Sequence, residues 1–409
     1  MESGLQVPLD PAGIAVATSR NGASAAVADG PRLRILVLAD RDWTHPQGGG
    51  TGVNVYENIV RWARAGHEVT LVAGDYPGAV PVEQIEPNLV VHRVGGRGSV
   101  FPRAAWKVMR GLGADADVVF EVINGITFLT PLWLRRPRVA LVNHPHRALF
   151  VGEFGRWLGL ILSLGLEELP LRLLYRRTPF LTISGTARDE LVMIDGIPAE
   201  NITIAYCGVE PGLYGPGEKS KDPRILYVGR LKAYKRIEVL LDMLTEMPRV
   251  TLDIVGHGDH GETLDDEISR RGLGDRVRVH GFVDEQRKAD LYREAWVHVT
   301  ASASEGWSLT VMEAALCGTP SAAVAVGGLR ESIVTGQTGL LAERPEDLRA
   351  CVQAMLEDDE LRERMSAAAL ERARTFTWDR AAATTLEVVV REAAATPSRG
   401  PRRRRRAPA

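Results

Sequence analysis

The stretch SASEGWSLTVMEAALCGTP, residues 302–320, decides how the chain is interpreted. Glu305 lies in a loop of small residues, and the apolar pattern after it predicts a short buried helix over Ser308–Cys317, ended by a glycine and a proline. Glu313 would lie in the first turns of that helix. Free N–H groups and the positive end of the helix dipole favour a phosphate there. Carboxylates beside a phosphate site indicate a ligand with both phosphates and hydroxyls, as in a sugar nucleotide. The alternative is that both acids only cap the helix and offset its dipole.

Composition excludes several classes of protein. The chain has 409 residues, too many for one ordinary core, so we expect two domains. A net charge of −2 is unlike the basic balance of nucleic-acid-binding domains, so no nucleic-acid partner is expected. Three cysteines without metal-ligand spacing favour a reduced, cytoplasmic location. The N-terminus lacks a signal-peptide pattern, and no segment has the ~18 uninterrupted apolar residues of a membrane-spanning helix.

The order of expected elements occurs twice along the chain. An apolar strand beginning at Arg32 precedes a glycine-rich loop (45–52), a helix (53–66) and a second strand (67–74), which together form a parallel βαβ unit. The pattern restarts at Pro223 and continues with strands at 249–258, 276–283, 295–302 and 320–326. We therefore predict an α/β fold of two doubly wound, Rossmann-like domains that face a cleft, with ligands at the carboxyl ends of the strands.

Composition also predicts the boundaries of these parts. The expected segments are a disordered extension (1–31), a first domain (32–205), a linker (206–222), a second domain (223–375) and a disordered basic tail (396–409).

Arg230 and Lys235 lie in the loop that follows the first strand of the second domain. Two cations at the carboxyl end of a strand can hold a diphosphate and offset its charge as it leaves. Cations at a helix start oppose the helix dipole, so a ligand explains them better than stability does. A solvated charged loop is the alternative.

Gly48, Gly49 and Gly50 precede a predicted helix and would let the backbone approach a phosphate. They do not form the dinucleotide fingerprint, because Val53 occupies the position of its third glycine. This counts against a nicotinamide-dependent oxidoreductase.

His144 and His146 follow an apolar strand. No third ligand has a matching spacing, so we expect no metal site. Either histidine could face the cleft, or both could hold their loop by hydrogen bonding. Glu331 follows a glycine pair at another strand end, where the alternative is an ordinary helix-start acid.

Taken together, these features resemble the retaining glycosyltransferases of family four, which have the GT-B fold. The resemblance covers about residues 32–392 and is strongest over Tyr227–Leu341, where the glutamate pair, CGTP and GG-x-x-E follow one another. It implies transfer of a sugar from a nucleotide-diphosphate-sugar donor to an acceptor hydroxyl, with the anomeric configuration kept and without an essential metal or other cofactor. It also implies that the helix at 376–392 crosses back to complete the first domain.

The resemblance further implies a role for each candidate residue. Arg230 and Lys235 would contact the donor diphosphate, while Glu305 would hold the sugar hydroxyls. Glu313 would accept hydrogen bonds from the ribose. A first-domain histidine would lie by the anomeric carbon, with His146 as first choice and His144 as second. The other donor-binding positions would be Gly48, Gly49 and Gly50 over the diphosphate, Gly306 beside the first glutamate, Ser308, Leu309 and Thr310 at the phosphates, and Val283 near the base.

The segment 150–177 would lie where the first domain meets the acceptor. Residues 103–177 carry eleven Lys and Arg against six Asp and Glu, and the apolar run Leu158–Leu166 is too short to span a bilayer. This predicts peripheral contact with the inner face of a membrane, or a lipid-linked or anionic acceptor. The alternative is a core helix flanked by ordinary arginines. The run Arg402–Arg406 could also attract anionic lipid.

Three other functions are compatible with the same fold: a sugar-nucleotide epimerase, a phosphorylase, and a non-catalytic sugar-nucleotide-binding protein. The presence of both glutamates, both cations and a candidate histidine argues against lost activity. The nucleotide base, the sugar, the acceptor and the oligomeric state leave no readable trace in the side chains.

Overall fold

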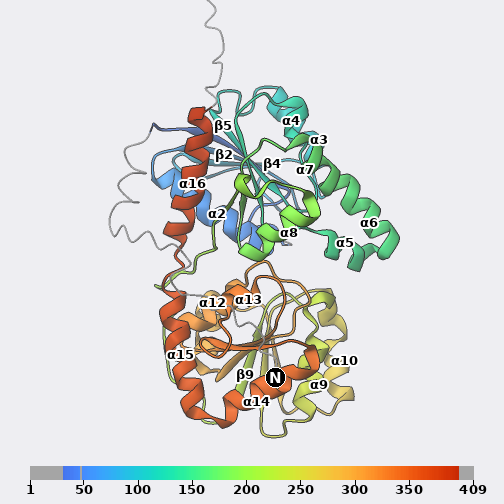
Figure 1. Cartoon of the computed structure of the whole chain (residues 1–409), viewed down its shortest axis with the longest axis vertical. Coiled ribbons are helices and arrows are strands. Elements are labelled where there is room, and N and C mark those ends of the chain that lie inside the picture. The colour runs from blue at the N-terminus through green and yellow to red at the C-terminus, as the bar shows by residue number, and fades with distance from the viewer. Residues whose placement is uncertain (1–30, 47, 396–409) are drawn as a thin grey trace, which may run out of the picture.

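The computed structural model describes residues 31–46 and 48–395. The chain forms two α/β domains, each built on one sheet (Figure 1). Residues 1–30 of the expected extension (1–31) and the basic tail (396–409), with Arg402–Arg406, lie outside the described residues. No helix in the described part of the chain is both long and apolar enough to cross a bilayer.

The first sheet has eight strands in the order β3-β4-β2-β1-β5-β6-β7-β8. Neighbouring strands run parallel except β3, which pairs with β4 in the antiparallel sense at the sheet edge, a hairpin that the sequence pattern did not indicate. The strands are β1 (Arg34–Leu38), β2 (Glu68–Ala73), β3 (Val82–Glu86), β4 (Leu89–Arg93), β5 (Val118–Ile123), β6 (Arg138–Val142), β7 (Phe180–Thr182) and β8 (Ile202–Ile204). Every residue of β5 is buried, as expected for a central strand covered by helices on both faces.

Helix α2 (Gly49–Arg64) begins four residues earlier than the predicted helix at Val53. Gly49 and Gly50 therefore form its first turn instead of a loop before it. Gly49 has φ +65°, which glycine adopts without steric cost. The other helices of this domain are α3 (Val100–Met109), α4 (Thr130–Trp133), α5 (Arg147–Phe154), α6 (Arg156–Ser163), the π-helix η1 (Leu164–Glu168), α7 (Leu169–Leu174) and α8 (Gly185–Asp195).

The second sheet has six parallel strands in the order β11-β10-β9-β12-β13-β14. They are β9 (Arg224–Val228), β10 (Thr251–Val255), β11 (Val277–Gly281), β12 (Val297–Thr300), β13 (Ser321–Val324) and β14 (Gly339–Ala342). The helices are α9 (Ile237–Thr245), α10 (Leu264–Arg270), α11 (Glu285–Glu294), α12 (Leu309–Leu316), α13 (Leu329–Ser332), α14 (Leu348–Glu357) and α15 (Asp359–Ala373). The helix predicted over Ser308–Cys317 is α12, which begins one residue later and ends one residue earlier than predicted.

The last helix, α16 (Trp378–Ala395), lies against the first domain beside α2 (Figure 1). The Trp62 indole on α2 donates to the Ala382 carbonyl across this contact, at 3.1 Å. The chain thus crosses between the domains twice, and the crossings lie side by side, because Val209 N–H donates to Phe376 O at 3.0 Å. The GT-B fold expected from the sequence is the observed fold.

Candidate active site

The carboxyl ends of the two sheets face each other, so the loops that follow the strands meet at the junction of the domains. A Cβ atom at Gly306, after β12, would lie 3.1 Å from both the His144 ring and the Ile183 side chain, which follow β6 and β7. A Cβ atom at Gly49 would lie 3.2 Å from the guanidinium carbon of Arg230. The junction therefore brings together glycine, histidine and arginine positions that the sequence predicted as site residues.

Glu305 and Lys235 form an ion pair at this junction. The Ser302 hydroxyl also donates to Glu305, at 3.0 Å. The Lys235 side chain is 14% exposed and that of Glu305 16%, so the pair is largely shielded from water and interacts more strongly than a surface pair. The sequence prediction assigned Lys235 to the diphosphate and Glu305 to the sugar hydroxyls, whereas in the structure the two side chains bind each other directly.

The loop that carries Glu305 is held by the glycine pair of the GG-x-x-E motif. Gly328 N–H donates to Glu305 O at 2.7 Å. A Cβ atom on Gly327 would lie 2.2 Å from Glu305 O, and one on Gly328 would lie 2.1 Å from Gly306 O. No side chain fits at either position, so the two glycines are required for the loop to pack here.

Ser308, Leu309 and Thr310 lie at the start of α12, as predicted. Ser308 has φ +83°, a left-handed conformation that costs a non-glycine residue about 1–3 kcal/mol and is concentrated at ligand sites. The N–H groups of the first helical turn have no acceptor within the helix. They can therefore donate to an anion.

Glu313 already has two protein partners on the neighbouring helix α11. The Tyr292 hydroxyl donates to it at 2.9 Å, and the Lys288 ammonium lies 3.3 Å away. Burial raises the pKa of Glu313. The sequence prediction missed Lys288 and Tyr292, although their spacing of four residues places them on one face of a helix.

His146 has protein partners at both ring nitrogens. Nε2 is 2.9 Å from the Asn124 amide oxygen, and Nδ1 is 3.2 Å from Glu167, which also accepts the His146 backbone N–H at 2.8 Å. Burial lowers the pKa of His146 to about 4, so the ring is neutral at neutral pH. His146, the first choice in the sequence prediction, is thus held inside the first domain.

His144 is the histidine that contacts the second domain. Its ring stacks on that of His146 with centroids 4.7 Å apart, and its edge faces Gly306. Nδ1 is 3.1 Å from Pro145 O, a contact that requires a proton on Nδ1 and leaves Nε2 as an acceptor. Burial, followed by the neighbouring His146, lowers the pKa of His144 to about 4. Of the two histidines, His144 is therefore the one that lies at the junction of the domains.

The π-helix η1 holds the loop that carries these histidines. Glu167 binds His146, and the next residue, Glu168, binds Arg147 with both carboxylate oxygens and accepts from Ser163 at 2.8 Å. Burial raises the pKa of Glu167 to about 7. The sequence prediction missed these contacts, because the partners lie 21 residues apart along the chain.

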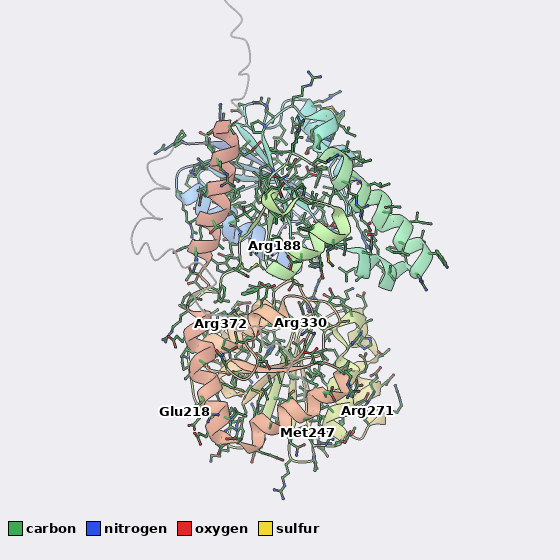
Figure 2. The ribbon with its side chains drawn as sticks, viewed as in Figure 1. Arg188, Glu218, Met247, Arg271, Arg330 and Arg372 are labelled. Atoms are coloured by element: carbon green, nitrogen blue, oxygen red, sulfur yellow. The ribbon has the colours of Figure 1, made fainter. Side chains whose placement is uncertain are left out.

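Glu331 joins the two domains. It accepts from the backbone N–H groups of Gly185 at 2.8 Å and Thr186 at 2.6 Å, from the Thr186 hydroxyl at 2.7 Å and from the Tyr206 hydroxyl at 3.1 Å. The residue does serve a helix start, as the alternative in the sequence analysis held, but the helix is α8 of the other domain. Near this junction, Arg188 and Arg330 lie on opposite domains (Figure 2).

Val283 follows β11 and packs, partly buried, against the core of the second domain. The adjacent Phe282 is 81% exposed, and its ring lies 6.1 Å from that of His257 at the end of the neighbouring strand β10. An exposed aromatic ring at a strand's carboxyl end offers a stacking surface for a base. Sequence reasoning named the backbone here and missed Phe282.

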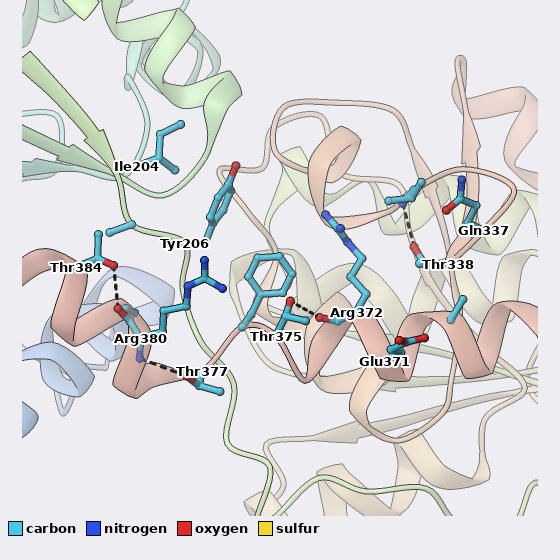
Figure 3. A pocket seen from close by; sticks show the side chains of 15 residues that line it. Ile204, Tyr206, Gln337, Thr338, Glu371, Arg372, Thr375, Thr377, Arg380 and Thr384 are labelled. Atoms are coloured by element: carbon cyan, nitrogen blue, oxygen red, sulfur yellow. Dashed lines mark hydrogen bonds between the residues drawn. The ribbon is translucent and has the colours of Figure 1, made fainter. Parts of the chain in front are cut away.

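A cavity of about 560 Å³ lies beside the chain crossings (Figure 3). Tyr206, Arg372, Phe376 and Arg380 are among its lining residues. The predicted donor-site residues do not line it. Tyr206, which donates to Glu331, does, so the cavity lies beside the domain contact and apart from the candidate active site. Within residues 31–46 and 48–395, no three His, Cys, Asp or Glu side chains are grouped as metal ligands.

Two family models match the chain in succession. Residues 48–213 match Glycosyltransferase Family 4, and residues 215–372 match Glycosyl transferases group 1. The chain is 32% identical over 234 residues to the D-inositol 3-phosphate glycosyltransferase of Xylanimonas cellulosilytica, covering 52% of this chain and 56% of that protein. A second such protein, from Thermobispora bispora, is covered over 53%, so the chain spans about half the length of these curated relatives.

Solved structures share the fold over nearly the whole described chain. Sucrose-phosphate synthase from Thermosynechococcus elongatus has a TM-score of 0.76 at 20% identity, covering 89% of this chain and 100% of that one. Anabaena Alr3699/HepE in complex with UDP-glucose has a TM-score of 0.68 at 19% identity, covering 86% and 99%.

Proposed function

This chain belongs to the glycosyl transferases group 1 family, and on that basis we propose that it transfers a sugar from a nucleoside-diphosphate donor to an acceptor hydroxyl with retention of configuration. One observation carries the proposal: Arg230 and the Lys235–Glu305 ion pair, at the strand ends of one sheet, lie opposite His144 at the strand ends of the other. Cations suit the diphosphate, and the carboxylate suits the sugar hydroxyls.

In this proposal Arg230 and Lys235 offset the negative charge that grows on the leaving diphosphate. Stabilisation of such charge by groups already in position is usually the largest catalytic contribution. Because Lys235 also binds Glu305, it fixes the distance between the diphosphate and the sugar. The start of α12, at Leu309 and Thr310, adds backbone donors for phosphate oxygens.

We propose that these cations and the helix start make a divalent metal unnecessary. In this proposal no carboxylate acts as a covalent nucleophile. Glu305 is held by Lys235 and Ser302 and binds the sugar hydroxyls instead. The acceptor would then attack on the face from which the diphosphate leaves. A neutral His144, with Nε2 as an acceptor, can orient a sugar hydroxyl beside the reacting carbon.

The proposal includes an acceptor that is lipid-linked or anionic, since arginines are frequent in the segment that follows the His144 loop. It also includes a cytoplasmic location, which suits three free cysteines. Uridine diphosphate is the first nucleotide to test, because a structure of similar fold is described with UDP-glucose.

The test begins with thermal shifts of the full chain in UDP, GDP, ADP and TDP, each with magnesium and with EDTA. A ligand at 100 times its Kd stabilises by about 2.7 kcal/mol. We expect one nucleotide to raise the melting midpoint equally in both buffers, and its sugar conjugates to show enzyme-dependent release of the nucleotide. The product of one turnover, read by NMR, should keep the anomeric configuration.

Each part of the proposal has its own contrary result. No shift with any nucleotide would overturn the donor site. Binding without release across donors and acceptors would favour a non-catalytic protein, and release without transfer to an acceptor would favour an epimerase. Loss of activity in EDTA would overturn metal independence, and an inverted product would overturn retention.

A further inference from the structure

Helices α5 and α6 project from one side of the first domain (Figure 1), and the segment α6–η1–α7 carries large apolar side chains that are exposed. Trp157 is 76% exposed, Ile161 66% and Leu173 69%. Leu158, Leu164 and Leu169 are each more than 40% exposed beside them. Helix α6 buries only Gly159 and Ser163, so its large apolar side chains contribute little to the core. We call these six exposed side chains the α6–α7 face.

The spacing of these residues shows one continuous stripe instead of scattered exposures. Trp157, Ile161 and Leu164 follow the four- and three-residue steps of one helical side, and Leu169 and Leu173 are again four apart. Single exposed apolar residues are ordinary on proteins, but a contiguous patch indicates a surface that is covered by a partner.

The charges around this face identify the partner. Arg156 lies with its guanidinium 5.8 Å from the Trp157 ring, and Arg172, Arg176 and Arg177 are exposed. Within residues 156–177, all of which the structure describes, the only acids are Glu167 and Glu168, and both are buried toward the His146 loop. The segment itself is thus apolar and positive, and the exposed acid before it, Glu153, is paired with Arg97. Aromatic and aliphatic side chains flanked by arginine are typical of helices that lie in the interface of an anionic bilayer.

We propose that the α6–α7 face docks on an anionic lipid bilayer. A second copy of the chain fits this face less well, because two such faces would bring arginines together and residues 156–177 offer no exposed acid to neutralise them. The arginines supply the attraction to lipid phosphates, and the apolar stripe enters the acyl boundary.

The inner side of the same segment holds the candidate active site. Glu167 binds His146 and Glu168 binds Arg147, two and three residues after His144, which faces the second domain. A docked chain would therefore place the His144 loop close to the lipid surface. This consequence rests on the proposed function, because it implies that the acceptor hydroxyl is presented from the membrane.

The experiment compares the binding of the full chain to vesicles of phosphatidylcholine with and without phosphatidylglycerol, by co-sedimentation at low and high salt. The test variant carries Trp157→Ser and Ile161→Ser. The matched control is Met193→Ser, which changes an equally exposed apolar side chain on α8 (76%). A third variant changes Arg402–Arg406 to serine, because that run could bind anionic lipid by itself. All four chains should show the same melting midpoint, since each change lies on the surface or outside the described residues.

We expect the wild-type chain, the control and the tail variant to bind only the vesicles with phosphatidylglycerol, and more weakly at high salt. The double variant should lose about tenfold or more in partition coefficient, as expected when two large apolar side chains no longer leave water.

Three results would overturn the inference: no binding to phosphatidylglycerol vesicles, equal binding by the double variant, or loss of binding in the tail variant alone. A dimer in sedimentation velocity that the double variant abolishes would show that a second copy covers the face instead. The nucleotide thermal shift, measured on the double variant, should equal that of the wild type. It separates failure of docking from failure of the donor site.

Discussion

The two sides of the domain junction are built from different kinds of group. On the second domain, charged side chains from different loops pair with one another, as Lys235 does with Glu305, 70 residues away in sequence. On the first domain, two neutral histidines stack on each other, and His146 is held by Asn124 and Glu167, which lie 22 and 21 residues away in sequence. In the proposed function, the charged side would bind the diphosphate, and the neutral side would position uncharged groups against it.

The strongest challenge to this contrast is Lys235→Ala, which removes the charge that we assign to the diphosphate. We expect kcat/KM to fall by about 100-fold or more, the effect of losing one preorganised charge contact. Lys232→Ala is the matched control, because Lys232 binds only the exposed Asp259 in the contacts described. Steady-state nucleotide release measures both, and activity of Lys235→Ala within a few-fold of wild type would contradict the assignment.

Gly328→Ala tests whether the charged side depends on its backbone. The new Cβ atom would lie 2.1 Å from Gly306 O, so the loop carrying Glu305 must move. A displacement of about 1 Å can reduce activity by 100-fold, and we expect a loss of that order. Gly274→Ala meets nothing within 4 Å and serves as the control. Equal activity of both variants would show that the glycine pair does not support the site.

Glu331→Gln tests the contact between the two sides. The amide keeps the shape of the side chain, but its NH2 group cannot accept a hydrogen bond. One of the two backbone donors, the Gly185 or the Thr186 N–H, therefore loses its acceptor, at a cost of about 1–3 kcal/mol. We expect the donor KM to rise by about fivefold to tenfold with a smaller change in kcat. Glu343→Gln, on the exposed pair with Arg330, should change neither value. A larger radius of gyration in X-ray scattering would support domain opening, and an unchanged KM would contradict it.

Glu167→Gln should have the smallest effect, and its sign depends on pH. The folded chain keeps the Glu167 proton up to a pKa of about 7, whereas the unfolded chain loses it near the ordinary value of 4.5. Because the folded state binds more protons in this window, the Glu167 contribution to stability falls as pH rises. Glutamine imitates the protonated acid and does not titrate. The variant should therefore gain in melting midpoint relative to wild type between pH 5 and pH 8.

The control for that series is Glu153→Gln, an exposed carboxyl paired with Arg97. Its difference from wild type should stay nearly constant over the same pH range. A gain for Glu167→Gln that does not grow with pH would show that Glu167 is ionised in the folded chain.

The sequence predicted the second-domain side more completely than the first, for a physical reason. Glu305, Gly306 and the glycine pair act through backbone contacts over about twenty residues, and such contacts require particular residue types in a readable order. The choice between His144 and His146 depended instead on which ring nitrogens find partners, and Asn124 and Glu167 could be recognised only after folding. The early start of α2 escaped prediction for a related reason, since glycine propensity opposes a helix that tertiary contacts impose.

The fold class followed from the alternation of apolar strands and amphipathic helices, which determines a parallel sheet almost directly. The antiparallel β3 did not follow, because a short, half-exposed edge strand has little hydrophobic pattern. The outward turn of α6 was left open by the sequence, since an apolar run has the same letters in a core and on a surface.

The two chain crossings between the domains lie side by side at Val209 and Phe376 and so define one axis for rotation of the domains. Two adjacent crossings permit one domain to rotate against the other about the line through them, and they restrict other relative motions. The displacement in such a rotation grows with distance from the axis. Tyr206 lies only three residues from Val209, so the Glu331 contact lies near the axis and moves least. The Glu331 contact would therefore keep the two domains aligned, while the part of the junction farthest from the axis opens to exchange ligands.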